Sequence, residues 1–155
     1  MDTIDYRIPK VEIKSDIAID NGVAFEEDEY IMFLDKISRY RHGEETVFEF
    51  LSKKKGFIPL KKSSSGEFII VNMDDIAYIR EKEKNVLSLQ RQIKLYMKNN
   101  LSLELGHINP LPDSQSRVLD YLNQDSLFLL FYQEDQKIFI NKSKIIKVIE
   151  KSGKP

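Results

Sequence analysis

The sequence predicts a mainly β (α+β) protein built from two tandem small five-stranded barrels, each with one short helix, packed together. Two observations lead to this expectation. Short apolar runs that alternate with polar residues follow one another closely and are separated by turn residues, as in all-β proteins. The pattern of the first half then returns in the second half of the 155-residue chain. A unit of roughly 60 residues buries little surface by itself, and short strands lose their free edges by curling into a barrel.

The internal repeat has an offset of 71 residues, which becomes 69 after a polar turn. The aligned pairs include Val47 with Val118, Phe57 with Phe128, Ile69 with Ile138, Asn72 with Asn141 and Ile76 with Ile145. Carried back without a gap, the first offset aligns Tyr30 with Leu101 and Leu34 with Leu105. A shared Asn and a single gap placed in a turn indicate a tandem duplication. The alternative is two unrelated stretches of hydrophobic strands.

The predicted organisation follows from the repeat. It comprises an N-terminal extension (1–17), a first unit (18–83), a linker (84–90), a second unit (91–152) and a tail (153–155). The linker is too short for the two units to tumble freely.

In the second unit, Leu101, Leu103 and Leu105 alternate with polar or small residues, as in a half-buried strand. The expected elements of this unit are strands at 93–97 and 101–105, a short helix capped at 113–114 that carries Val118, a hairpin of 126–132 with 137–140, and a last strand at 145–149. The first unit is expected to repeat this order, with strands near 22–26 and 29–34, a helix near 44–51, a hairpin turning at 62–66 and a final strand at 76–80.

Two segments, 68–79 and 138–148, consist of a strand, a tight polar turn and a second strand. This pattern resembles the last hairpin of Sm-like and SH3-like small barrels. The stretch 117–123, followed by Phe128, resembles an uncharacterised bacterial domain family in which a short helix ending in Leu-Asn precedes a hairpin and an Asn-Lys turn. These resemblances imply a small-barrel fold. The turns at 72–75 and 141–144 lack the Gly that RNA-binding Sm-like proteins usually carry there.

Charge is divided unequally along the chain. The net charge is −1, but residues 1–83 hold 13 Lys/Arg against 18 Asp/Glu, and residues 84–155 hold 11 against 7. The opposite signs allow three interpretations: attraction between the two barrels, head-to-tail self-association, or a local phosphate-facing patch in the basic unit. The residues considered for phosphate or partner binding are Lys137, Lys142, Lys144 and Lys147, together with Arg39 and Arg41.

No catalytic, metal or cofactor motif stands out. The chain has no Cys and only two His, which removes thiol nucleophiles and thiolate sites and leaves little imidazole chemistry. We interpret Asn72 and Asn141 as structural turn residues, because Asn tolerates left-handed backbone angles and can hydrogen-bond its own turn. We expect a protein that is not an enzyme and uses no cofactor.

The sequence therefore predicts a non-enzymatic interaction module, a scaffold or a regulator, that binds a protein partner or itself. The alternative is nucleic-acid or phosphate-ligand binding through the basic second unit. No apolar stretch has the length of a signal peptide core or of a membrane-spanning helix, so we expect a cytoplasmic protein that does not insert into membranes.

Overall fold

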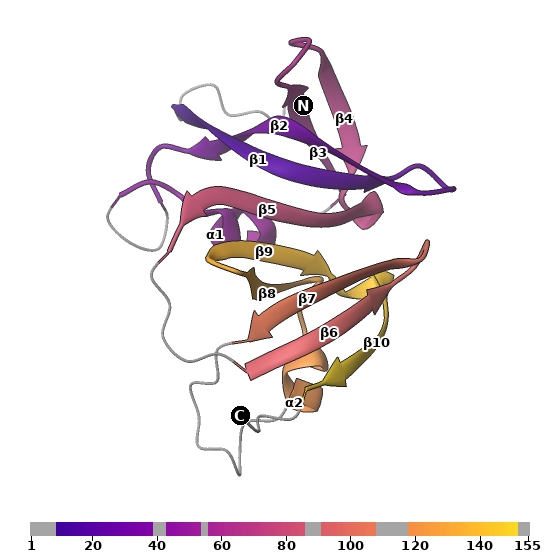
Figure 1. Ribbon diagram of the computed structural model, residues 1–155. Coiled ribbons are helices and arrows are strands. Elements are labelled where there is room, and N and C mark those ends of the chain that lie inside the picture. The colour runs from indigo at the N-terminus through magenta and orange to yellow at the C-terminus, as the bar shows by residue number, and fades with distance from the viewer. Residues whose placement is uncertain (1–8, 39–42, 54–55, 86–90, 108–117, 152–155) are drawn as a thin grey trace.

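A computed structural model describes residues 9–38, 43–53, 56–85, 91–107 and 118–151 (Figure 1). The elements of the first half are β1 (Lys10–Asp20), β2 (Phe25–Asp35), α1 (Val47–Lys53), β3 (Phe57–Lys62), β4 (Phe68–Asn72), the 3₁₀ turn η1 (Met73–Asp75) and β5 (Ile76–Lys84). Those of the second half are β6 (Arg91–Met97), β7 (Leu101–His107), α2 (Val118–Leu122), β8 (Phe128–Gln133), β9 (Gln136–Asn141), the 3₁₀ turn η2 (Lys142–Lys144) and β10 (Ile145–Glu150). The prediction of a mainly β protein is confirmed.

The ten strands form one antiparallel sheet in the order β10-β6-β7-β8-β9-β5-β1-β2-β3-β4. Within each half the order is the same: the fifth strand lies beside the first, followed by the second, third and fourth. The expected closure into two five-stranded barrels is absent from the described pairings, because β9 bonds to β5 of the other half and the sheet stays open. Figure 1 shows β5 and β9 side by side at the centre of the molecule.

The open sheet follows from the apolar character of its two central strands. Ile76, Ala77, Tyr78 and Ile79 of β5 are all buried, as is the run from Ile138 to Asn141 in β9. A strand that is apolar on both faces is stable only when both faces are covered. Pairing β5 with β9 places both strands between the two cores, so that both faces of each strand are covered.

Each half has its own hydrophobic core, and the two central strands contribute to both cores. The first core contains Phe128 and Phe139 of the second half, whereas the second core contains Ala18, Ala77 and Tyr78 of the first half. Successive side chains of a strand point to opposite faces, so Tyr78 and Ile79 of β5 enter different cores, as do Phe139 and Ile140 of β9. The halves are therefore packed into each other.

The first strand begins earlier in the chain than expected. A strand was predicted near 22–26, but β1 covers Lys10–Asp20 and the chain turns after it. Asn21 Oδ1 accepts hydrogen bonds from the backbone N–H groups of Val23 and Ala24 at 2.8 and 2.9 Å, and Gly22 has a φ of 94°. Asn-Gly is a strong turn signal, and it outweighs the strand propensity of the residues that follow. The predicted boundary between residues 17 and 18 falls inside β1.

The second strands of the two halves correspond with a different offset from the predicted 71. Ile31 of β2 lies opposite Lys61, and Gly106 of β7 lies opposite Tyr132, which makes the offset between β2 and β7 75. The β1–β2 hairpin is longer than the β6–β7 hairpin, and the residues of β2 are shifted by four positions relative to those expected from the offset of 71. An even slip keeps the same side chains on the core face.

The first helix is shorter than predicted and has a clear start. Thr46 Oγ1 accepts from the backbone N–H of Glu49 at 3.1 Å, and Glu49 Oε1 accepts from the backbone N–H of Thr46 at 2.9 Å. This reciprocal capping box fixes the beginning of α1, which buries Val47, Phe50 and Leu51. The cap expected at 113–114 for the second helix lies outside the described residues. Neither described helix has the length and apolar character needed to cross a membrane.

Candidate functional site at the sheet edges

The pairing of β5 with β9 is the contact that holds the two halves together. Its register places Tyr78 opposite Ile140, Ile79 opposite Phe139 and Arg80 opposite Ile138. Ile79 and Phe139 both belong to the first core, while Tyr78 and Ile140 belong to the second. We call this contact the β5–β9 junction.

A fully buried side chain, Asn141, secures one end of the junction. Its Oδ1 accepts from the backbone N–H of Ser143 at 2.9 Å and so caps its own turn, η2. Its Nδ2 donates to the backbone oxygens of Asp74 at 3.1 Å and Ile76 at 2.9 Å, in the other half. One amide thus caps a turn and joins two halves, which is more than the turn role interpreted from the sequence.

Asn72 occupies the same position in the first half, before η1. Its Oδ1 accepts from the backbone N–H of Asp74 at 3.0 Å, which is the same capping bond. Within the part of the chain that the structure describes, its Nδ2 has no hydrogen-bond partner, and the residue is only half-buried. The two Asn residues therefore share the cap but not the second contact.

Arg80 forms a charged cluster at the other end of the junction. Its guanidinium donates to Gln133 Oε1 of the second half at 2.7 Å and lies 3.3 Å from an Asp16 carboxylate oxygen and 3.2 Å from Glu27. Burial by itself would lower the pKa of Arg80, but Glu27 and Asp16 raise it by a larger amount. The cluster ties β5 to β1 through Asp16, to β2 through Glu27 and to β8 of the second half through Gln133.

The outer face of β8–β9 is covered by the first half. Phe128, Leu130 and Phe139 lie on this face and pack against the first core, and Phe128 and Phe139 are only 7% and 2% exposed. This face supplies the apolar side of the β5–β9 junction.

The corresponding face of β3–β4 has no such cover from the part of the chain that the structure describes. We call Phe57, Pro59, Phe68 and Ile70 the β3–β4 patch; the pairing of Pro59 with Ile70 and of Phe57 with Asn72 places these side chains on one face. Phe57 is 65% exposed, Phe68 66% and Ile70 77%. Phe68 stacks on Phe33, with 5.9 Å between ring centroids. An apolar patch of large side chains beside the outer edge of a terminal strand is a typical interaction surface.

The opposite end of the sheet, β10, is also unpaired on one side. Ile146 and Ile149 of β10 are exposed and Ile145 and Val148 are half-buried, whereas Ile76 and Ile79 at the corresponding positions of β5 are fully buried. The difference arises because, among the described strands, β5 has neighbours on both sides and β10 pairs with β6 alone. Figure 1 shows β4 and β10 at opposite ends of the molecule.

Of the lysines predicted as a phosphate or partner patch, Lys137 lies apart from the other three, and Lys142, Lys144 and Lys147 make contacts within the chain. Lys137 is in β9, and three strands separate β9 from β10, which contains Lys147. Lys142 Nζ donates to the backbone oxygen of Gln124, and Lys144 Nζ lies 3.0 Å from Asp20 Oδ2.

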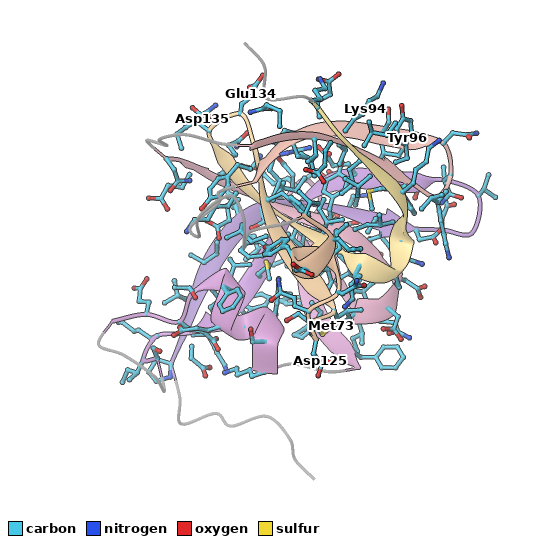
Figure 2. All side chains as sticks on the ribbon, turned by 90° about the horizontal axis from the view of Figure 1, so that it is seen from below. Met73, Lys94, Tyr96, Asp125, Glu134 and Asp135 are labelled. Carbon is cyan, nitrogen blue, oxygen red and sulfur yellow. The ribbon has the colours of Figure 1, made fainter. Side chains whose placement is uncertain are left out.

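Lys147 lies on the outer surface of β10. Its Nζ is 4.9 Å from the centroid of the Tyr96 ring, and Lys94 Nζ is 5.3 Å from the same centroid. Figure 2 shows Lys94 beside Tyr96. Each contact is a cation–π pair, which favours the observed side-chain position by a modest amount. Arg39 and Arg41 lie outside the described residues.

The sequence reasoning missed the β3–β4 patch. A signal was present: the run from Phe68 to Val71 is apolar at every position, unlike a strand with one face in solvent. Its counterpart at 137–140 is apolar at every position except Lys137, and there the apolar run is buried on both faces. A strand with this pattern indicates a partner on its outer face.

The described residues contain no group of three or more His, Cys, Asp or Glu side chains that could hold a metal ion. No protein-family model, curated protein or solved structure matches the chain.

Proposed function

We propose that this protein is a non-enzymatic interaction module, a scaffold or a regulator, that binds a protein partner or itself through its unpaired sheet edges. The observation that carries the proposal is the β3–β4 patch, in which three large apolar side chains are exposed beside the free edge of β4. An incoming strand would gain backbone hydrogen bonds from this edge and would cover the patch with its side chains.

The composition of β4 is typical of a strand that pairs with another strand along its outer edge. Proteins normally protect a free edge with Lys, Pro, a bulge or a very short strand. The five residues of β4, from Phe68 to Asn72, include no Lys and no Pro, and their pairing with β3 runs through five consecutive residues without a register shift.

We also propose that each half is an open relative of the SH3-like and Sm-like small barrels, and that the halves arose by tandem duplication. Two features support this. The strand order is identical in the halves, and in each the fourth and fifth strands are joined by a three-residue 3₁₀ turn with an Asn cap.

The positions of the lysines favour a protein partner over a phosphate ligand. Lys142 and Lys144 are engaged with Gln124 and Asp20, so they would have to give up these contacts to bind a phosphate. Nucleic-acid binding through the second unit stays a prediction, and the experiment below includes it as an outcome.

The proposal can be tested by placing a photo-crosslinking amino acid, benzoylphenylalanine, at Ile70 and irradiating cells that produce the full chain. The matched control has the same group at Val23, which is exposed in the β1–β2 turn and belongs to neither β4 nor β10. We expect protein adducts, to the chain itself or to another protein, from position 70 and not from position 23. Equal labelling at both positions, or no protein adduct from position 70, would contradict the proposal. Adducts that nuclease removes would support nucleic-acid binding instead.

A further inference from the structure

We propose that the partner of the β4 edge is a second copy of this chain, whose β10 pairs with β4 in the register of the β5–β9 junction. This inference rests on the proposed function, since it names the partner for the same edge. It concerns a contact between chains, whereas the β5–β9 junction lies within one chain.

The order of the strands in the sheet favours this pairing. The junction joins the fifth strand of one half, β5, to the fourth strand of the other, β9. The strands that remain without a partner on one side are the other fourth strand, β4, and the other fifth strand, β10. Pairing β4 with β10 of a second copy would extend the sheet by the same step that already joins the halves.

The register of the β5–β9 junction also predicts which residues of β4 and β10 would lie opposite each other. Ile79 lies opposite Phe139 in the junction, and moving each residue by 69 positions, β5 forward and β9 back, places Val148 opposite Ile70. The same step places Lys147 opposite Val71 and Ile149 opposite Ile69. The new contact is therefore apolar at its centre, and no two like charges face each other in it.

The proposed contact would cover the apolar β3–β4 patch. Phe128 and Phe139 fill the first core at the junction, and the residues in their places in the first half are Phe57 and Ile70. These two residues are exposed in the single chain. In the proposed contact they would lie against β10 of the second copy, where Ile145 and Val148 are only half-buried. Both surfaces would bury apolar area that is exposed to water in the single chain, and this burial stabilises association.

The pairing would also give the side-chain amide of Asn72 hydrogen-bond acceptors. Asn141 Nδ2 donates to the backbone oxygens of Asp74 and Ile76 across the junction. By the same step of 69 residues, Asn72 Nδ2 would donate to the backbone oxygens of Ser143 and Ile145 in the second copy. This contact would supply the partner that the Asn72 amide lacks among the described residues.

Charge also favours this pairing. The turn beside β4 contains exposed Asp74 and Asp75, whereas the turn beside β10 contains Lys142 and Lys144. The proposed contact brings the acidic turn of one copy beside the basic turn of the other, and it joins the acidic half of the chain (−5) to the basic half (+4). The contact uses two different surfaces, so it builds a closed ring or an open filament of many copies.

The absence of Cys from the chain allows a direct test by disulfide trapping. Full-length Ile70→Cys and Val148→Cys chains are mixed and oxidised gently, because directly opposed residues of antiparallel strands have a Cα separation that suits a disulfide. The control replaces the first chain by Val23→Cys, which is equally accessible. We expect covalent dimers of the Ile70→Cys and Val148→Cys chains at least tenfold above the control, and a rise of sedimentation coefficient with concentration for the unmodified chain.

A second variant tests the polar contact without disturbing the fold. Asn72→Asp keeps the oxygen that caps η1, replaces the Nδ2 donor and adds a carboxylate charge, which in the proposed contact would face the two backbone oxygens of the second copy. We expect its dissociation constant for self-association to rise by about tenfold, the size expected for lost hydrogen bonds to an interface.

The outcomes separate this inference from the proposed function. Trapping of Ile70→Cys with itself, but not with Val148→Cys, would show an edge that pairs symmetrically, and it would overturn the head-to-tail contact while leaving the interaction module intact. A chain that stays monomeric at all concentrations and gives no trapped dimer would overturn self-association. In that case photo-crosslinking at position 70 to a different protein would still support the proposed function.

Discussion

The side-chain amide of Asn141 donates to the backbone oxygen of Ile76 over 2.9 Å, and this bond connects the last turn of the second half to the last strand of the first. The same amide also reaches the backbone oxygen of Asp74, and its own oxygen caps η2. Because Asn141 is fully buried, none of these groups can turn to water instead. One side chain therefore couples the turn geometry of one half to the placement of the other.

We expect Asn141→Asp to lower the free energy of unfolding by about 3 kcal/mol or more, since it removes two hydrogen bonds and places a carboxylate against two carbonyl oxygens. Asn72→Asp keeps the equivalent cap at a half-buried position, and we expect a change within about 0.5 kcal/mol. Urea unfolding of both variants at low protein concentration measures the difference. Similar losses in the two variants would show that the Asn141 amide does not join the halves.

Much of the second half could be predicted from the sequence, because its strands are short, alternate clearly and are separated by polar turns. The predicted strand at 93–97 lies within β6, and the predicted last strand at 145–149 lies within β10. The expected mainly β fold depended on the same local signals.

The first half was harder to predict for two physical reasons. β1 was missed because its alternation continues through polar residues such as Ser15 and Asp16, although Asn21-Gly22 marked the end of a strand. The slip of four residues in β2 was invisible because periodicity determines which face a side chain occupies and not which residue it pairs with.

The open sheet depends on contacts between the halves, and no local pattern specifies such a neighbour. The apolar runs around Tyr78 and Phe139 indicated strands covered on both faces, but not which strand covers them. For the same reason the candidate site was found at the edges of the sheet, where the structure shows which copy of a repeated pattern is covered and which is exposed.

The next prediction concerns acid stability and the buried Asp35. Lys10 Nζ lies 2.5 Å from Asp35 Oδ1, and Lys53 Nζ lies 2.8 Å from Oδ2. Burial by itself would raise the pKa of Asp35, but the two ammonium groups outweigh it and lower the pKa to about 2. A carboxyl with a lowered pKa stabilises the folded state above its unfolded pKa, and this contribution is lost as the pH falls through the folded value.

We therefore expect the wild-type chain to be more stable than Asp35→Asn at pH 6, and this difference to shrink by about 2 kcal/mol between pH 4 and pH 2. Denaturant unfolding at several pH values measures the difference directly. A gap that stays constant over this range would contradict the ion pairs of Asp35 with Lys10 and Lys53.

A further prediction concerns Lys144, which the sequence suggested as a phosphate ligand. The pKa of Asp20 is lowered first by a hydrogen bond from the backbone N–H of Gly22 and then by the Lys144 ammonium. We expect Lys144→Met to raise the pKa of Asp20 without restoring its ordinary value, because the Gly22 bond remains. Carbon NMR of the carboxyl groups during a pH titration measures this change. Lys147→Met serves as the control, since Lys147 contacts Tyr96, and an equal shift in both variants would contradict the Lys144–Asp20 pair.

The last prediction is that the two halves unfold together. Phe139 lies in the first core and Tyr78 in the second, so neither core stays intact when the other half separates. Met32→Ala affects only the first core and Leu95→Ala only the second, and both side chains are fully buried. We expect each variant to lose about 2–5 kcal/mol and to shift one common transition. The chain has seven Tyr and no Trp, so tyrosine fluorescence and far-ultraviolet circular dichroism follow that transition. Two separate transitions, each moved by only one variant, would show instead that the halves fold independently and that the β5–β9 junction adds little to their stability.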